Sequence, residues 1–233
     1  MSNVSIQAKL AQIPDRILDL AMSALRQANT HAVYLDRGNE HWGLMSVLNA
    51  AHAGELFIKA RIANAHPLLV FTKVDASAVP TNPAEIDTLL TSGKTHNFEK
   101  LPDILKSTTG VSIANTALFE RLRKARNSIQ HFCPPENEID PGKLALEFIY
   151  LVIDPLIRSE FNLFAIEFHE DPNVGYDYVV AGLLRQQIRF SVPDDFEVPE
   201  IELDEEIENA DEDYKAWFRG ELHRIGKSNL VTF

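Results

Sequence analysis

Apolar residues recur at helical spacing along most of the chain, in segments separated by short stretches rich in Gly, Pro and Asn. The first such segment predicts a helix over about 13–29, with its apolar residues on one side. The segment 41–67 is apolar around most of its circumference and ends at a proline, which indicates a long, buried, central helix. Shorter helices are expected at 84–90 and 97–107.

The second half of the chain continues the pattern, with helices predicted at 113–132, 142–168 and 176–189 and a kink at Pro155 in the second of them. A last amphipathic helix is expected at about 205–224. The helix at 113–132 carries an apolar stripe at spacings of three and four residues: Leu118, Leu122, Ala125, Ile129 and Phe132. The chain is therefore expected to be all-α.

The composition changes after residue 190. Between Asp194 and Asp213 there are 12 acidic residues and no Lys or Arg. The whole chain has 22 basic and 34 acidic residues, so outside this window the two signs are balanced and an anionic substrate is not excluded. We expect a helical bundle at 1–190, and at 191–233 an acidic extended segment with an amphipathic helix that packs on the bundle. The acidic segment either improves solubility or covers the basic stretch RLRKAR (121–126).

Several classes of protein are disfavoured. The single cysteine, Cys133, excludes a disulfide framework and a Cys-based metal site within one chain. The chain has no Walker loop and no Gly-rich dinucleotide turn, so no cofactor is expected. The N-terminus lacks the apolar region of a secretory signal, and the longest apolar run (144–157) is too short to span a bilayer. We therefore expect a soluble, cytoplasmic protein without a membrane partner.

The stretch RKARNSIQHF (123–132) is the candidate site. The structural alternative is that Arg126 pairs with a carboxylate and His131 is a solvated helix end. At 100° per residue, Asn127 and His131 lie on the same outer face of the predicted helix, whereas Arg126 points about 140° away from His131. Two such helices meeting at a twofold axis would bring Arg and His together. Histidine suits general acid–base chemistry and a guanidinium suits a phosphoryl transition state, as in metal-free RNA transesterification. The residues expected to bind RNA phosphates are Arg121, Arg123 and Lys124.

The sequence RNSIQHF (126–132) resembles the signature of the HEPN superfamily, small all-helical proteins of which many are ribonucleases. That signature is an Arg, then a polar residue that is often Asn, and a His four to six positions after the Arg. Residues 49–71 resemble the long central helix of bacterial HEPN-like proteins. The resemblance covers about residues 10–190. Position 133 is Cys, where members silenced by a nucleotidyltransferase antitoxin carry Tyr.

The resemblance implies a four- to five-helix up-and-down bundle that forms a homodimer with both motifs in one cleft. It implies catalytic roles for Arg126, Asn127 and His131, and cleavage of RNA to a 2′,3′-cyclic phosphate and a 5′-hydroxyl. Many members are toxins or serve in anti-phage defence, so an antitoxin or defence-system protein is an expected partner. The alternative is a non-catalytic HEPN-like module that binds a nucleotide, RNA or a partner protein.

Two further residues, His52 and Glu55, share one face of the central helix. They either orient Arg126 or His131, or are structural, with Glu55 paired to Lys59 and His52 buried. A di-metal carboxylate bundle would require two Glu-x-x-His repeats. This chain has only the reversed order His52…Glu55, so no metal site is expected.

Overall fold

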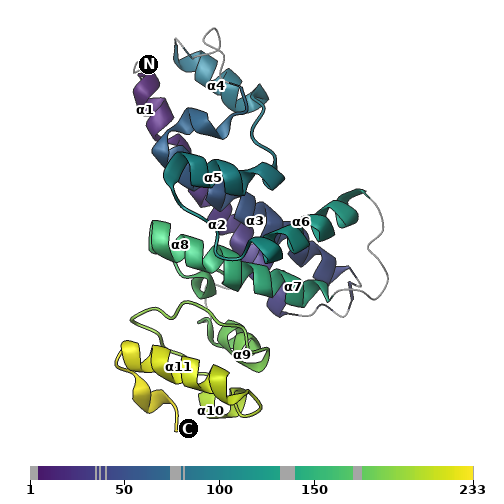
Figure 1. Cartoon of the computed structure of the whole chain (residues 1–233), viewed down its shortest axis with the longest axis vertical. Helices are drawn as coiled ribbons and strands as arrows, with labels where there is room; N and C mark the ends of the chain where they lie inside the picture. The colour runs from purple at the N-terminus through teal and green to yellow at the C-terminus, as the bar shows by residue number, and fades with distance from the viewer. Residues whose placement is uncertain are drawn as a thin grey trace. The chain divides into compact units, whose positions relative to one another are not determined.

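The computed structural model describes residues 5–34, 36, 38–39, 41–73, 80, 82–131, 140–169 and 175–232. Over these residues the chain is mostly helical and has no strand, only one antiparallel bridge between Phe71 and Thr95 (Figure 1). The all-α prediction is therefore confirmed. Within the same residues, no helix combines the length and the apolar character needed to cross a membrane.

The chain divides into two compact units, each made of two separate pieces of sequence. Unit 1 comprises Met1–Met22 and His52–Ile113, and unit 2 comprises Ser23–Ala51 and Ala114–Phe233. Two long helices, α2 (Ile13–Val33) and α3 (Trp42–Ala65), contribute residues to both units. Residues 191–233 belong to unit 2.

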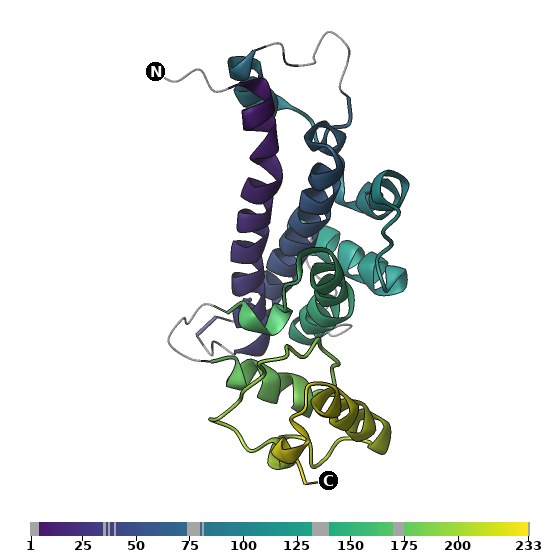
Figure 2. The ribbon, with the colours of Figure 1, turned by 90° about the vertical axis from the view of Figure 1, so that its left-hand side faces the viewer.

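Unit 1 combines the N-terminal residues up to Met22 with the second half of α3 and the shorter helices that follow it. Its α1 lies next to α4 (Figures 1 and 2), where Lys9 Nζ is 2.5 Å from Asp87 Oδ2. The buried side chains of α3 in this unit include Phe57, Ile58 and Ile62, in agreement with the prediction of a buried central helix. Besides its shares of α2 and α3, unit 1 has α1 (Ile6–Ala11), η1 (Pro67–Val70), α4 (Pro83–Ser92), η2 (Phe98–Lys100) and α5 (Leu101–Thr109).

Unit 2 holds the predicted candidate helix and the C-terminal segment. Its α6 packs against α7 (Figure 1). Besides its shares of α2 and α3, it has α6 (Thr116–His131), α7 (Pro141–Phe148), the π-helical turn η3 (Ile149–Ile153), α8 (Asp154–Phe161), η4 (Ala165–Glu167), α9 (Asp177–Arg185), α10 (Leu203–Glu206), α11 (Glu212–Arg224) and η5 (Ser228–Leu230).

The helix predicted at 142–168 differs from the structure in two ways. A π-helical turn, η3, separates α7 from α8 and ends two residues before Pro155. Proline has no N–H to donate and its ring crowds the carbonyl four residues earlier, and a widened turn accommodates both effects. The helix also ends early, at Phe161, because Asn162 adopts a left-handed conformation with φ 56°.

The C-terminal helix predicted at about 205–224 is also interrupted. A short α10 ends at Glu206, and α11 begins only after Asp211, whose side chain accepts a hydrogen bond from Tyr214 N at 2.7 Å. An Asp at this position satisfies an N–H at the start of a helix, so it marks a boundary that the apolar periodicity does not reveal.

The acidic C-terminal segment packs within unit 2 through an aromatic cluster: Tyr176, Phe190, Phe196, Tyr214, Trp217 and Phe218. Phe196 and Phe218 are completely buried, with ring centroids 6.3 Å apart. Tyr214 Oη donates to Ile188 O at 2.8 Å, and Arg185 pairs with Glu206. Burial of this much aromatic surface holds the acidic segment on α9 and on the chain that follows it.

Candidate functional site

The candidate helix α6 is positioned by its first two turns. Asn115 Oδ1 accepts a hydrogen bond from Leu118 N at 3.0 Å, which starts the helix. Leu118, Phe119 and Leu122 are buried, and the Phe119 ring lies 6.1 Å from that of Phe148 in α7. Further along, Ala125 and Ile129 of the predicted stripe are only half-buried, and Phe132 lies outside the described residues. The C-terminal half of α6 is therefore more exposed than its N-terminal half.

All three motif residues lie in this second half. Asn127 and His131 are exposed, and Arg126 is half-buried. Because α6 is an uninterrupted α-helix from Thr116 to His131, Asn127 and His131 share one face and Arg126 projects about 140° from His131. His131 is in the last turn, where the helix dipole favours a cation.

The basic residues around the motif are partly neutralised by neighbouring carboxylates. Arg121 Nη1 is 3.2 Å from Glu147 Oε2, and Arg123 Nη2 is 2.9 Å from Glu120 Oε2. Lys124 is exposed, and no carboxylate within the described ranges forms an ion pair with it. Of the three predicted phosphate-binding residues, Lys124 therefore presents its full charge to solvent.

The second pair of predicted site residues lies on α3 in unit 1. Lys59 Nζ donates to Glu55 Oε1 at 2.6 Å and to Thr95 Oγ1 at 3.0 Å, and Lys59 is only 8% exposed. The structural interpretation of Glu55 as the partner of Lys59 is therefore confirmed. The matching expectation that His52 is buried is wrong, because α3 turns this side chain to solvent.

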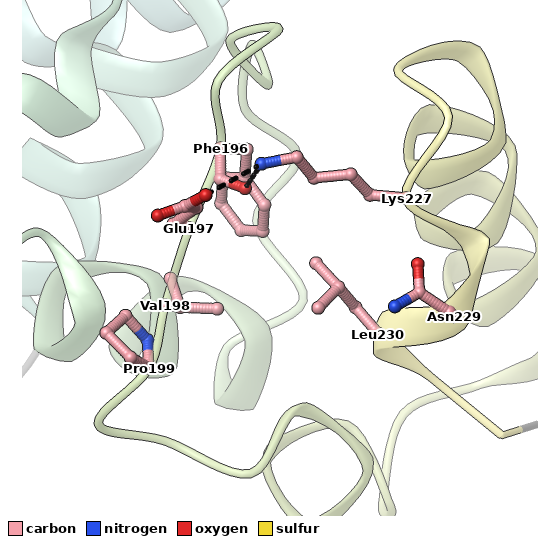
Figure 3. Close-up of a pocket in the computed structure, with 7 residues that line it drawn as sticks. All are labelled: Phe196, Glu197, Val198, Pro199, Lys227, Asn229 and Leu230. Carbon is pink, nitrogen blue, oxygen red and sulfur yellow. Dashed lines mark hydrogen bonds and ion pairs between the residues drawn. The ribbon is translucent and has the colours of Figure 1, made fainter.

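The acidic segment contributes a pocket of about 350 Å³ at the C-terminal end of unit 2. Figure 3 shows Lys227 reaching across to the extended chain, where Nζ donates to Phe196 O at 2.7 Å and lies 3.5 Å from Glu197 Oε1. Val198 and Leu230 form its apolar walls. Together with the pairing of Arg185 and Glu206, these contacts hold the segment in place. That the acidic segment covers the basic stretch 121–126 stays a prediction.

No protein-family model, curated protein or solved structure matches this chain. The candidate site therefore rests on the residues of the chain itself. In the described part of the chain, no group of three or more His, Cys, Asp or Glu side chains is placed to hold a metal ion.

Unit 2 also contains a buried polar network that the sequence pattern did not predict. Asp154 is 1% exposed, its Oδ1 accepts from Ala165 N at 2.9 Å and its Oδ2 from Ser191 N at 2.6 Å. Nearby, Tyr150 Oη donates to Asn29 Oδ1 at 2.9 Å, and Asn29 Nδ2 donates to the carbonyl of Ala165 at 2.8 Å. The signal available in the sequence was a lone Asp within the apolar run 144–157.

Burial dominates the electrostatics of this network. Loss of solvation raises the pKa of Asp154 to about 6, although hydrogen bonds from Ala165 and Ser191 and the charge of Arg158 oppose the shift. Burial and the nearby Asp154 carboxylate also raise the pKa of Tyr150 well above its ordinary value. Every buried side-chain polar atom in the described residues has a hydrogen-bond partner, so the network reads as a structural element of the core.

Proposed function

We propose that the protein is a metal-independent endoribonuclease of HEPN type that acts as a homodimer of four- to five-helix, up-and-down bundles. The observation that carries the proposal is the exposure of Asn127 and His131 on one face of α6, next to a half-buried Arg126 and an exposed Lys124. Arg126, Asn127 and His131 are the residues that carry the resemblance to the HEPN signature. Their position on a rigid helix, anchored by buried residues in its first half, suits a preorganised site.

The chemistry follows from the properties of the side chains. His131 accepts the proton of the ribose 2′-hydroxyl, whose oxygen attacks the adjacent phosphorus. The bond from phosphorus to the 5′-oxygen breaks, and the His131 imidazolium formed in the first step protonates the leaving oxygen. Arg126 stabilises the charge on the phosphoryl oxygens, and Asn127 positions the substrate by hydrogen bonding. The products are a 2′,3′-cyclic phosphate and a 5′-hydroxyl.

A homodimer resolves the geometry of the motif. Arg126 and His131 diverge by about 140° on one helix, so a single α6 presents them toward different directions. Two α6 helices related by a twofold axis present the Arg of one copy beside the His of the other. We propose RNA as substrate, and a role as a bacterial toxin or in anti-phage defence, where an antitoxin or another defence protein restrains the activity.

A second function, in binding without catalysis, is favoured by the divergence of Arg126 and His131 on α6 and by the ion pairs of the basic stretch 121–126. Arg121 and Arg123 each have a carboxylate within 3.2 Å, which lowers the charge available for RNA phosphates. A non-catalytic HEPN-like module that binds a nucleotide, RNA or a partner protein requires neither convergence of Arg126 with His131 nor a proton transfer.

Cleavage of total RNA and of a defined tRNA in the presence of EDTA tests the proposal. We expect His131→Ala to lower cleavage by about 10²- to 10⁴-fold, the usual contribution of a general acid–base residue. His223→Ala is the matched control, because His223 is also an exposed histidine in the last turn of a helix of unit 2. If neither the wild type nor the control cleaves RNA, and both bind it, the binding module is the better description.

Mixed dimers test whether the site is shared between two copies. Arg126→Gln and His131→Ala are each expected to be inactive alone. When they are mixed and allowed to exchange subunits, half of the dimers contain one intact site, so activity should return to about a quarter of the wild-type value. Absence of recovery, with subunit exchange verified by mass spectrometry, would argue against a shared site.

A further inference from the structure

Unit 2 contains a second pocket, of about 330 Å³, distinct from the α6 face. It lies where the end of α8, the chain around residue 191 and the last turn of α11 meet. Its lining residues are Arg158, Phe190, Ser191, Val192, Glu221 and Arg224. Two guanidinium groups therefore line one small concave site in a chain whose net charge is −12.

The two arginines differ in how many of their donor nitrogens are already hydrogen-bonded. Arg224 uses all its donor nitrogens within the protein: Nε donates to Glu221 at 2.9 Å, Nη1 to Asp194 at 3.2 Å and Nη2 to Val192 O at 2.6 Å. It therefore joins α11 to the chain at 192–194 and holds the pocket together. Its charge is already balanced by two carboxylates.

Arg158 is held in place without being neutralised by an ion pair. Its guanidinium lies over the Phe164 ring, 4.6 Å from the centroid, and its Nη1 donates to Asn162 Oδ1. Among the described residues, no carboxylate lies within ion-pair distance of Arg158, and no acceptor bonds to its Nε or Nη2. The stacked ring and the Asn162 bond restrict the guanidinium, so little freedom remains to be lost on binding.

The two unused nitrogens are a chemically meaningful pair. Nε and Nη2 are on the same edge of a guanidinium, and their N–H groups are parallel. They form the forked donor that binds two oxygens of one carboxylate or phosphate. Glu221, the acidic side chain of the pocket, is paired with Arg224, which reduces its repulsion of an incoming anion.

We infer that this pocket binds a small oxyanion, a phosphate or carboxylate group, through the Nε and Nη2 edge of Arg158. The site goes beyond the proposed ribonuclease and does not depend on it. The alternative is that Arg158 binds no anion and serves only to stabilise the ionised carboxyl of the buried Asp154, whose pKa the Arg158 charge lowers. The two roles differ in what they predict for added anions.

The test is a titration of the 233-residue chain with inorganic phosphate, followed by ¹H–¹⁵N NMR that includes the arginine Nε–H groups. Chloride keeps the ionic strength constant. We expect saturable shifts of the Arg158 Nε–H and of the backbone amides of Ser191 and Val192, with a dissociation constant in the millimolar range. Arg158→Gln should weaken binding at least tenfold. Arg16→Gln, which removes an exposed arginine outside the pocket, should leave it unchanged.

Further titrations identify the chemical class of the anion and distinguish binding at this pocket from binding at the α6 face. Tighter binding of adenosine 5′-monophosphate than of phosphate would indicate a nucleotide, and tighter binding of succinate a carboxylate. His131→Ala should bind phosphate normally, whatever its effect on RNA cleavage. Equal titrations of wild type and Arg158→Gln, or equal shifts at all arginines, would overturn the inference. If Arg158→Gln does not fold, Arg158→Lys is used in its place. Lysine lacks the paired donors of a guanidinium, so full phosphate binding by Arg158→Lys would also overturn the inference.

Discussion

Replacement of Asp154 by asparagine tests the electrostatic account of the core of unit 2. The wild-type carboxylate is 1% exposed and accepts one backbone N–H on each oxygen, from Ala165 and from Ser191. Asparagine has nearly the same shape and cannot ionise. It retains one acceptor oxygen and presents an NH₂ group to the second backbone N–H. The variant therefore removes the titration of Asp154 at the cost of one hydrogen bond.

The magnitude follows from the pKa of Asp154, which burial raises from 3.8 to about 6. From about pH 4 to pH 6 the folded chain keeps a proton that the unfolded chain has released. The stability that this group contributes is therefore fully present below pH 4 and is lost as the pH rises to 6. A shift of about two pH units corresponds to about 3 kcal/mol. The free energy of unfolding of Asp154→Asn, relative to wild type, should therefore increase by about 3 kcal/mol from pH 4 to pH 7.5.

Urea unfolding followed by tryptophan fluorescence is a suitable assay, because Trp42 and Trp217 both belong to unit 2. Fluorescence also permits dilute samples near the sequence pI of about 5.1, where solubility is lowest. Titrating groups that do not interact with Asp154 cancel in the difference between the two proteins. Asp213→Asn, at an exposed position of α11, is the control. A difference between Asp154→Asn and wild type that stays constant with pH, or falls as pH rises, would refute the dominance of burial.

The other predictions concern stability within unit 2. Gly226 follows α11 with φ 74°, a conformation that alanine adopts only with strain, so Gly226→Ala should destabilise the protein by roughly 1 kcal/mol. Gly220 lies within α11, where alanine is the better helix former, so Gly220→Ala should stabilise the protein by about 0.5–1 kcal/mol. An added Cβ meets open space at both positions. Urea unfolding of the two variants should give shifts of opposite sign, and equal signs would contradict the backbone argument. Tyr214→Phe should lower the free energy of unfolding by about 1–2 kcal/mol, because the buried hydroxyl donates to Ile188 O at 2.8 Å. A decrease below about 0.3 kcal/mol, roughly a fifth of that expectation, would show that water replaces the hydrogen bond.

Much of the fold was predictable from the order of apolar and polar residues. The burial of α3 was predictable because apolar residues cover most of its circumference. The position of α6 and the buried state of Leu118 and Leu122 followed from a stripe at helical spacing. For the candidate site, the sequence also predicted that Asn127 and His131 share a face, because that relation depends only on the pitch of one helix.

Other boundaries depended on local chemistry that periodicity does not report. The π-helical turn before Pro155, the left-handed Asn162 and the cap at Asp211 each depend on where one backbone donor or acceptor finds its partner. An apolar pattern continues through such positions, so the predicted helices at 142–168 and 205–224 were too long.

The sequence by itself determined that this protein is helical, which helix faces are apolar and where its acidic residues gather. Only the tertiary structure decided which polar groups from distant parts of the chain meet. Asp154 lies 37 residues from Ser191 in the chain, and their hydrogen bond exists because α8 and the segment after α9 pack together. The hydrogen bonds of Arg224 to Asp194 and Val192 likewise join segments that are distant in sequence. Helical spacing constrains neighbours within a few turns, whereas partners across the core are chosen by packing of the whole unit.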